Sequence, residues 1–534
     1  MSTGRTTVAG TVALFRFALR RDRLRLPVWI AVGTFMVVTQ SVSSQAIYDN
    51  AADLAAYRAS VGSNAATIAL AGPPVGLDTV AGAVAFEISA TVMLIASLMA
   101  MFTVARHTRS DEEAGRTELV RSARVGRHAP LLAAVLLSSA ACLVLALTIG
   151  VATTASGLPT TGSFVLGASV GACGLVFTGI TAVAAQVSGH TRTVYGLVGG
   201  LFAVAFVLRA VGDIEGNWVV WTSPIGWAQA THPFSDDAVV PLVLCLAVGA
   251  ALVVSGFALL DRRDLGSGLI ATRPGRAAAR RGLLSPLGLA VRLHRGALLA
   301  WTVGLAVLGV VYGALAESVE TLIGENEQAL AIFGDPDVDQ LVDAYLGTTF
   351  AVTALLASAY AVSAVLRARA EESDNRAEPV LARAVSRARW LGSHVGVALV
   401  GSALAMAASG ATTGLVRTAQ TGEGSAFGRN LGAALSYVPA IWVVAGVAVA
   451  LFGLVPRLSG AFAWSALGAF LIITMFAESF DWPSWVADLS PIQWTPTVPL
   501  EEWAPEPLVG LLAVAAVLLA LGFGGFRRRD LVTA

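Results

Sequence analysis

The chain has 534 residues, of which 56% are hydrophobic and only 13% are charged, and its formal net charge is zero. Soluble domains carry about 25% charged residues, so this composition excludes a chain of ordinary soluble domains. Apolar runs such as Leu131–Ile149 and Leu511–Phe523 approach or reach the ~20 residues that cross a bilayer. The sequence therefore predicts an all-α polytopic membrane protein.

In chain order, the apolar runs predict twelve transmembrane helices, six in each half. Those of the first half lie near Pro27–Ser44, Thr79–Ala105, Ala129–Thr153, Phe164–Val187, Val194–Ala210 and Val239–Leu260. Those of the second half lie near Ala297–Leu315, Tyr345–Leu366, Leu391–Val416, Ala433–Phe452, Leu458–Phe476 and Leu508–Phe526. We predict two transmembrane halves, residues 1–266 and 267–534, each with an amphipathic helix before its six spans.

The amphipathic helices are predicted from apolar residues at helical spacing next to arginines. Before the first span these are Val8, Val12, Phe15 and Leu19, and before the seventh they are Leu284, Leu287 and Val291. Such helices lie on the membrane surface. A simpler interpretation is that they only anchor the topology.

All 35 basic residues are arginine, and they are distributed unevenly over the predicted topology. Thirty-one lie in the termini and loops on one side of the twelve spans, and four lie on the other side, namely Arg58, Arg209, Arg417 and Arg429. Because short cytoplasmic loops are enriched in basic residues, both termini are expected in the cytoplasm.

Four sequence features recur in the same order in the two halves, at offsets of 260 to 272 positions. They are LRRDRLRLPVW and VRLHRGALLAW, EEAGRTELVRSARVGR and EESDNRAEPVLARAVSR, SPIGW and SPIQW, and RRDLG and RRDLV. Since six spans separate the copies, both enter the membrane from the same side, which predicts a parallel 6+6 repeat.

The cytoplasmic loops after the second and eighth spans are short and dense in charge. Their candidate residues are Glu112, Glu113, Arg116, Glu118 and Arg127, and Glu371, Glu372, Arg376, Glu378 and Arg387. Glu112 and Arg116 have i, i+4 spacing, as do Glu372 and Arg376, and this spacing supports an exposed helix. A solvated turn would explain the arginines, but not the glutamates that recur at matching positions. We interpret the loops as surfaces presented to a cytoplasmic partner.

SPIGW and SPIQW lie on the outer side, before the last span of each half, in loops that hold seven of the twelve tryptophans. Their candidate residues are Ser223, Pro224 and Trp227, and Ser490, Pro491 and Trp494. Ser-Pro begins turns and helices, and tryptophan favours the headgroup zone. The pattern fits a short helix at the outer mouth and, equally, a simple aromatic belt.

Glu87 is the acidic residue that lies well inside a predicted span. Carboxylates within the membrane are costly and suggest a functional site, although a carboxyl group hydrogen-bonded to a neighbouring helix is the alternative. Its counterpart 260 positions later is Gly347, so any role belongs to one half. Three cysteines, Cys142, Cys173 and Cys245, lie in apolar runs and are expected in the core, not as metal ligands.

The chain contains no lysine, and a phosphate-binding P-loop requires one. No set of nucleophile and base is recognisable either, so we expect a transport subunit and not an enzyme. If ATP drives transport, ATP and Mg²⁺ are expected on a separate subunit.

The phrases TRSDEEAGRTELVRSARVGR, SPIGWAQATHPF, RRDLGSGL and LSPIQWTPTVP resemble those of ABC-2-type exporter permeases, and more narrowly the fused actinobacterial permeases of polyketide-antibiotic exporters. The resemblance implies a multi-pass subunit of the bacterial plasma membrane that docks two copies of a separately encoded ABC ATPase. It also implies outward transport of amphiphilic compounds, such as antibiotics, drugs or lipids, by alternating access. The candidate residues of the two charged loops would then belong to coupling helices, the second shortened by Pro379.

Two alternatives remain open. A proton-coupled multidrug transporter would have the same 6+6 layout, and a membrane scaffold would transport nothing. The expected partners are the ATPase, membrane lipids and a small-molecule substrate, and no nucleic acid.

Overall fold

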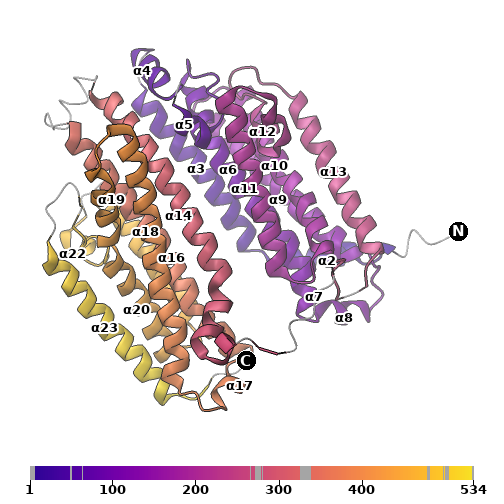
Figure 1. The fold of residues 1–534 in the computed structure, drawn as a ribbon. Helices are drawn as coiled ribbons and strands as arrows, with labels where there is room; N and C mark the ends of the chain where they lie inside the picture. The colour runs from indigo at the N-terminus through magenta and orange to yellow at the C-terminus, as the bar shows by residue number, and fades with distance from the viewer. Residues whose placement is uncertain are drawn as a thin grey trace. The chain divides into compact units, whose positions relative to one another are not determined.

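The computed structural model describes residues 7–48, 51–62, 64–264, 266–270, 278–279, 281–324, 338–477, 482–496, 498 and 504–531. Within these ranges the chain is helical and contains no strand (Figure 1). It consists of two compact units, Met1–Gly275 and Arg276–Ala534, and the large hydrophobic clusters lie within one unit or the other.

The first unit is built on six long helices that match the predicted spans of the first half. They are α3 (Arg25–Ile47), α6 (Val80–Ala105), α9 (Ala129–Ala155), α10 (Thr160–Val187), α11 (Thr191–Glu215) and α13 (Val240–Asp261). At one end of this bundle lie α2 (Thr11–Arg21), the π-helix η1 (Arg106–Ser110), α7 (Asp111–Glu113) and α8 (Arg116–Arg121) (Figure 1). At the other end lie α4 (Ala51–Val61), α5 (Ala65–Ala71), the 3-10 helix η2 (Trp218–Thr222) and α12 (Pro224–Gln229).

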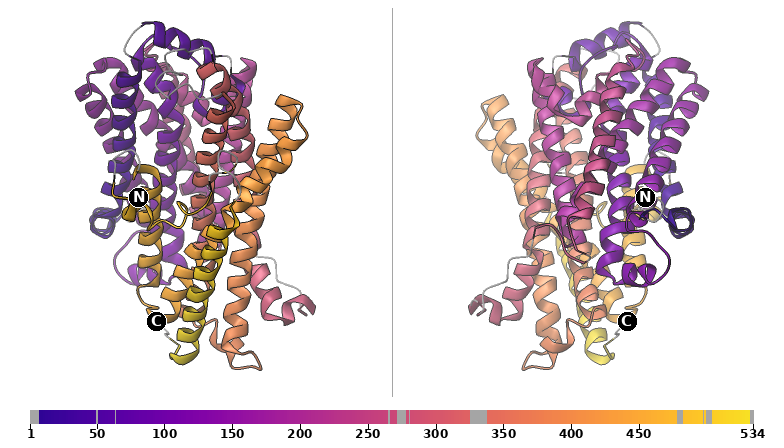
Figure 2. Two further views of the ribbon diagram at one scale, coloured as in Figure 1. Left: turned by 90° about the vertical axis from the view of Figure 1, so that its left-hand side faces the viewer. Right: turned by 90° about the vertical axis from the view of Figure 1, so that its right-hand side faces the viewer.

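The predicted amphipathic helix before the first span is α2. It lies across the bundle and not along it, as the two views of Figure 2 show in dark indigo. Val12 and Leu19, which share one face of this helix, are exposed. An exposed apolar face beside arginines suits a helix at the membrane surface.

The centre of the first unit is formed by α6 and α10. In each helix, 78% of the residues in the most apolar stretch are buried. Glycines on α10 allow this close packing: a Cβ atom at Gly167 would lie 2.2 Å from the carbonyl oxygen of Ala146 on α9. Small residues at helix contacts are typical of membrane bundles, in which close van der Waals packing replaces the hydrophobic effect. In contrast, α3 and α13 expose most of their apolar surface.

The second unit begins with the 3-10 helix η3 (Arg281–Leu284) and the long helix α14 (Pro286–Gly324). It continues with α16 (Val338–Ser373), α17 (Glu378–Leu381), α18 (Arg387–Thr421), α19 (Ser425–Ser436), α20 (Val438–Leu454), α21 (Ser459–Phe476), α22 (Ser484–Ala487) and α23 (Pro505–Arg528). Leu287 and Val291, which were predicted on an amphipathic helix, lie in the first turns of α14, continuous with the seventh span.

Eleven helices of the described chain are long and apolar enough to span a membrane, which confirms a helical polytopic membrane protein. The predicted span Leu458–Phe476 corresponds to α21, which has 18 residues. Such a helix rises about 27 Å, slightly less than the ~30 Å hydrocarbon core. The count of twelve spans and the 6+6 layout therefore stay predictions.

A matched pair of glycines on α23 tests the packing of the second unit. A Cβ atom at Gly522 would lie 2.4 Å from the carbonyl oxygen of Val449 on α20, whereas one at Gly524 meets nothing within 4 Å. Gly522→Ala should lower the unfolding free energy by about 2 kcal/mol relative to Gly524→Ala, because both gain the same helix propensity but only one forces the helices apart. Thermal unfolding of the purified variants in detergent, followed by tryptophan fluorescence, measures this difference. Equal melting temperatures would contradict the tight α20–α23 contact.

Candidate functional site

The loop after α6 holds a buried carboxylate between two buried guanidinium groups. Glu112 forms ion pairs with Arg109 (Oε2 to Nη1, 2.8 Å) and with Arg263, just beyond α13 (Oε1 to Nη2, 2.7 Å). The side chains of Arg109, Glu112 and Arg263 are 1%, 9% and 4% exposed. Removing any one of the three charges would leave the others buried and poorly compensated, so we expect the cluster to act as a unit.

The same arginines bind backbone carbonyl groups at helix ends. Arg109 donates from Nη2 to the carbonyl oxygen of Ala185, in the last turn of α10, at 2.6 Å. Arg127 donates to the carbonyl oxygens of Leu260 and Arg263, at the end of α13, at 2.7 Å each. The last carbonyl groups of a helix have no intrahelical partner and carry the negative end of its dipole, so guanidinium groups stabilise them. We call Arg109, Glu112, Arg127 and Arg263 the first clamp.

The second unit contains the same arrangement, formed by Arg369, Glu372, Arg387 and Arg529, which we call the second clamp. Glu372 receives two parallel contacts from Arg529, at 2.6 and 2.8 Å, and lies 3.8 Å from Arg369. The Arg529 guanidinium also lies over the rings of Phe452 and Phe526, 5.0 Å from each centroid. Arg387 donates to the carbonyl oxygens of Phe526 and Arg529 at the end of α23.

The two clamps use residues at equivalent sequence positions. Arg109, Glu112 and Arg127 precede Arg369, Glu372 and Arg387 by 260 positions, and Arg263 precedes Arg529 by 266. The repeated RRDL sequence thus supplies an arginine to each clamp. Sequence analysis identified the repeat of RRDL but assigned it no role, and it missed Arg109 and Arg369 altogether.

The exposed helix that the spacing of Glu112 and Arg116 predicts is not continuous, and these two residues do not contact each other. Instead, Arg116 contacts Asp111 at 3.0 Å, because Gly115 adopts a left-handed conformation with φ of 70° and separates α7 from α8. In the second unit, Arg376 likewise contacts Glu371, at 3.1 Å, and Asn375 has φ of 57°. Both loops are therefore folded back turns and not single exposed helices.

The far side of each loop is exposed. Side chains of Arg116 and Arg376 are 56% and 54% exposed, and Glu118 and Glu378 are also exposed. Leu119 is 76% exposed in α8. We call Arg116, Glu118 and Leu119 the first loop tip, and Arg376, Glu378 and Pro379 the second. Pro379 lies in the first turn of α17, which has four residues against six in α8.

Glu113 belongs to neither the first clamp nor the first loop tip. Its carboxylate accepts hydrogen bonds from the backbone N–H and the hydroxyl of Thr191, at the start of α11, and lies 3.0 Å from His190. A carboxylate at a helix N-terminus is stabilised by the helix dipole. The loop thereby contacts the ends of α10, α11 and α13 at this end of the bundle, as well as its own helix.

The two SPIxW sequences make one common contact. The indole N–H of Trp227 donates to the backbone carbonyl oxygen of Trp221, and the indole N–H of Trp494 donates to the backbone carbonyl oxygen of Asp488. Each acceptor lies six residues upstream of its donor. Ser223 and Ser490 are fully buried. Here the structures diverge: Ser223 caps α12, and Pro224 opens that helix, whereas Ser490 and Pro491 lead into turns, with the Ser490 hydroxyl 2.9 Å from Thr474. Of the seven tryptophans in these loops, Trp503 lies outside the described residues.

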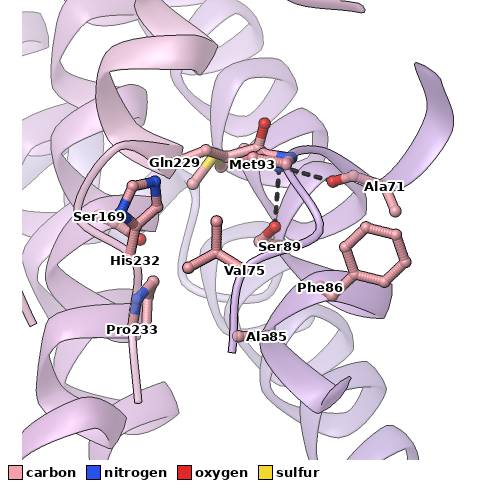
Figure 3. A pocket seen from close by; sticks show the side chains of 11 residues that line it. Ala71, Val75, Ala85, Phe86, Ser89, Met93, Ser169, Gln229, His232 and Pro233 are labelled. Atoms are coloured by element: carbon pink, nitrogen blue, oxygen red, sulfur yellow. Dashed lines mark hydrogen bonds between the residues drawn. The ribbon is translucent and has the colours of Figure 1, made fainter. Parts of the chain in front are cut away.

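A small pocket lies beside α12, shown in Figure 3. Gln229 donates there to the carbonyl oxygen of Ala71 and to the Ser89 hydroxyl, at 2.7 and 2.9 Å, and so ties α12 to α5 and α6. The volume of this pocket is about 30 Å³, which is enough for a water molecule but far below the ~300 Å³ of a drug-sized site. We assign this pocket no substrate.

Glu87, on α6, is hydrogen-bonded to Gln40 and Ser44 on α3, to Tyr48 just beyond α3, and to Tyr57 on α4. Gln40 and Ser44 donate to one carboxylate oxygen at 2.5 and 2.9 Å, and Tyr48 donates to the other at 2.9 Å. Burial, and then the charge of Glu87, raises the pKa of Tyr48, so its phenol stays a donor. The carboxylate therefore joins α6 to α3 and α4 through neutral donors.

Two matched glutamate substitutions test the clamps. Glu112→Gln should lower the unfolding free energy by about 3 kcal/mol, because Arg109 and Arg263 would be left buried without their counter-charge. Glu118→Gln, on the exposed loop tip, should change it by less than about 0.5 kcal/mol. Melting temperatures in detergent distinguish the two, and Glu372→Gln against Glu378→Gln repeats the comparison in the second unit. If Glu112→Gln is as stable as Glu118→Gln, the clamp contributes nothing to the fold.

Comparison with known proteins places these features in a family. The family model described as "Multidrug efflux system permease Rv1217c, C-terminal domain" matches residues 11–260 and 283–527, one segment in each predicted half. The multidrug efflux system permease protein Rv1217c of Mycobacterium tuberculosis (strain ATCC 25618 / H37Rv) is 37% identical over 524 residues, which cover 98% of this chain and 95% of that protein. This chain therefore belongs to the family of multidrug efflux permeases that includes Rv1217c.

Proposed function

We propose that the chain is the transmembrane subunit of an ATP-driven ABC exporter of the ABC-2 type, which moves amphiphilic or lipophilic compounds out of a bacterial cell. The observation that carries this proposal is the pair of exposed loop tips, each attached to a clamp that binds the inner ends of membrane helices. A clamp held by buried ion pairs is stiff, so a force on a tip would reach several helices at once.

The partner that supplies this force would be two copies of a separately encoded ATPase, which bind ATP and Mg²⁺. This chain has no lysine for a P-loop. Its loop tips combine a guanidinium, a carboxylate and, in the first copy, the exposed apolar side chain of Leu119. Mixed polar and apolar groups of this kind are suited to a protein interface.

In this proposal the chain works by alternating access. Movement of the two loop tips would shift the inner ends of the attached helices, and the substrate pathway would open to one side of the membrane and then to the other. The relative's name specifies multidrug efflux, which supports an antibiotic or drug-like substrate and the outward direction.

Proton coupling is the alternative energy source, and Glu87 is the carboxylate that it would require. However, Glu87 is held by neutral donors on α3, at Tyr48 just beyond α3 and at Tyr57 on α4, which suits a structural contact of α6 with these elements. Gln40, Ser44 and Tyr48 hold it in a fixed position, whereas a proton carrier has to exchange partners during transport.

Charge reversal of both loop tips tests the coupling. Arg116→Glu combined with Arg376→Glu should weaken co-purification of the ATPase and lower transport roughly tenfold or more, because like charges opposed across an interface cost several kcal/mol. The fold should persist, since exposed ion pairs contribute little to stability. The assay is affinity purification of the ATPase with the tagged chain from the native membrane, followed by ATP hydrolysis.

The matched control is Arg23→Glu combined with Arg292→Glu, two exposed arginines outside the loops. It changes the charge of the chain by the same amount and should keep the ATPase bound. Normal assembly and transport in the loop-tip variant would remove these loops from the mechanism.

The energy source is tested in inside-out vesicles that contain the chain and its ATPase. Uptake of ethidium should require ATP and should persist when a protonophore collapses the proton gradient. Glu87→Gln should retain more than about half of this uptake, since the amide oxygen can still accept from Gln40 and Ser44, and the amide N–H can donate to the Tyr48 hydroxyl oxygen. Uptake that stops with the gradient while ATP is present, or is abolished by Glu87→Gln, would favour the proton-coupled alternative. A chain that supports neither uptake nor stimulated ATP hydrolysis would favour a scaffold.

A further inference from the structure

A cavity of about 360 Å³ opens at the clamp end of the first unit. Its walls come from the junction of α2 and α3, from the last turns of α6 with η1, and from the start of α11. None of the loop-tip residues lines it, although its lining residue Arg21 shares Asp111 with Arg116 of the first loop tip. Its volume falls within the range of small-molecule sites.

The polar side of this cavity is positively charged. Arg21, Arg25 and Arg106 line it, together with the single carboxylate Asp22. Arg21 is held by Asp111, with both carboxylate oxygens 2.8 Å away. Because Arg21 and Arg106 are opposed by Asp111 and Asp22, Arg25 supplies the excess positive charge that favours an anion here.

Two of these arginines have hydrogen-bonding capacity to spare. Arg25 is exposed and has no carboxylate partner among the described residues. Arg106 Nη1 lies 3.2 Å from Asp22 Oδ1, yet the geometry makes no hydrogen bond, and this nitrogen atom is buried without an acceptor in the described chain. A buried charged donor without an acceptor is costly, and an anionic ligand would relieve that cost.

The other side of the cavity is aromatic. The Trp29 and Phe102 rings are stacked with centroids 6.0 Å apart, and Phe102 meets Tyr195 edge-on at 5.1 Å. Outside the cavity, Leu24 and Val28 are 73% and 61% exposed at the start of α3. A ligand that fits both sides has an anionic group and an adjoining apolar part.

We propose that this inner-face pocket, formed by Arg21, Arg25, Arg106, Trp29, Phe102 and Tyr195, binds the phosphate group of an anionic phospholipid of the cytoplasmic leaflet. The phosphate contacts Arg25 and Arg106, and the acyl chains lie along the exposed apolar surface of α3. Basic pockets between membrane helices on the cytoplasmic side are suited to anionic headgroups. A free phosphate ion shares the charge, but it makes no use of the aromatic wall.

The second half lacks these charges. In the alignment of LRRDRLRLPVW with VRLHRGALLAW, the positions of Arg21, Asp22 and Arg25 are occupied by Leu293, His294 and Ala297. The proposal therefore assigns one such lipid site to each chain, in its first half.

The test compares Arg25→Gln with Arg23→Gln in the purified full-length chain. Both variants remove one exposed arginine from the same segment, but only Arg25 lines the pocket. Native mass spectrometry of the chain titrated with phosphatidylglycerol should show one high-affinity lipid per chain. Its apparent affinity should fall about fivefold in Arg25→Gln and stay unchanged in Arg23→Gln. Phosphatidylcholine should not occupy the site.

Three results would overturn the proposal. Equal losses in both variants would mean that phosphatidylglycerol binds through the general surface charge. Equal binding of phosphatidylcholine would mean that no anionic group is recognised. Displacement of the lipid by inorganic phosphate at matching concentrations would assign the site to a free anion and not to a lipid. The assay needs neither ATPase nor transport, so its failure is independent of the proposed function.

Discussion

The ends of the membrane helices need partners for their last carbonyl groups, and the rest of the structure depends on how this need is met. Three helices of the first unit, α6, α10 and α13, end at the clamp, where their carboxyl ends bring negative dipoles together. Arg109, Arg127 and Arg263 donate to the carbonyl groups of α10 and α13 and to side chains near them. Their own charges would repel one another at this depth, and Glu112 offsets that repulsion. The negative charge of Glu112 thus allows several arginines to lie close together and buried, in a chain with few charged residues.

Only a few residues of the chain separate the clamp from the loop tip. In the proposed mechanism, this short connection couples the tip to the helix ends. Glu112 is held by α13 through Arg263, and Glu113 next to it caps α11. A left-handed Gly115 then turns the chain, and the exposed tip begins at Arg116. Since only three residues lie between Glu112 and Arg116, the proposed mechanism requires a displacement of the tip to reach the helix ends through this short connection. A longer loop would absorb such a displacement.

The sequence predicted the helical spans and the recurrence of charged segments, but it could not distinguish the buried members of a loop from the exposed ones. Glu112 and Glu118 look alike in a hydrophobicity profile, and their burial depends on Arg263, about 150 residues away in the chain. The matching RRDL segments contained the necessary signal, because residues that recur together in both halves can also contact each other there. The partners of Glu87 were recognisable as well: Gln40, Ser44 and Tyr48 recur at i, i+4 and i+8 on one helix face. The continuity of α14 could not be predicted from the sequence. The apolar residues around Pro286 follow the same pattern whether the chain turns there or continues as a helix.

What the two halves share and where they differ separates general requirements from specific ones. Both clamps keep the same four residue types, and Arg127 and Arg387 bind the end of the last helix of their unit in the same way. Their other contacts differ: the Arg529 guanidinium stacks on two aromatic rings, and the Arg263 guanidinium contacts Gln186. Any six-helix half of this kind needs its helix ends bound, so this arrangement is a requirement of the fold. The features present once, which are Glu87 with its donors, the inner-face pocket and the longer α8, are not needed to build a half. A feature that the fold does not require must be explained by what the protein binds or moves, and such features are therefore the places in which its binding specificity should be sought.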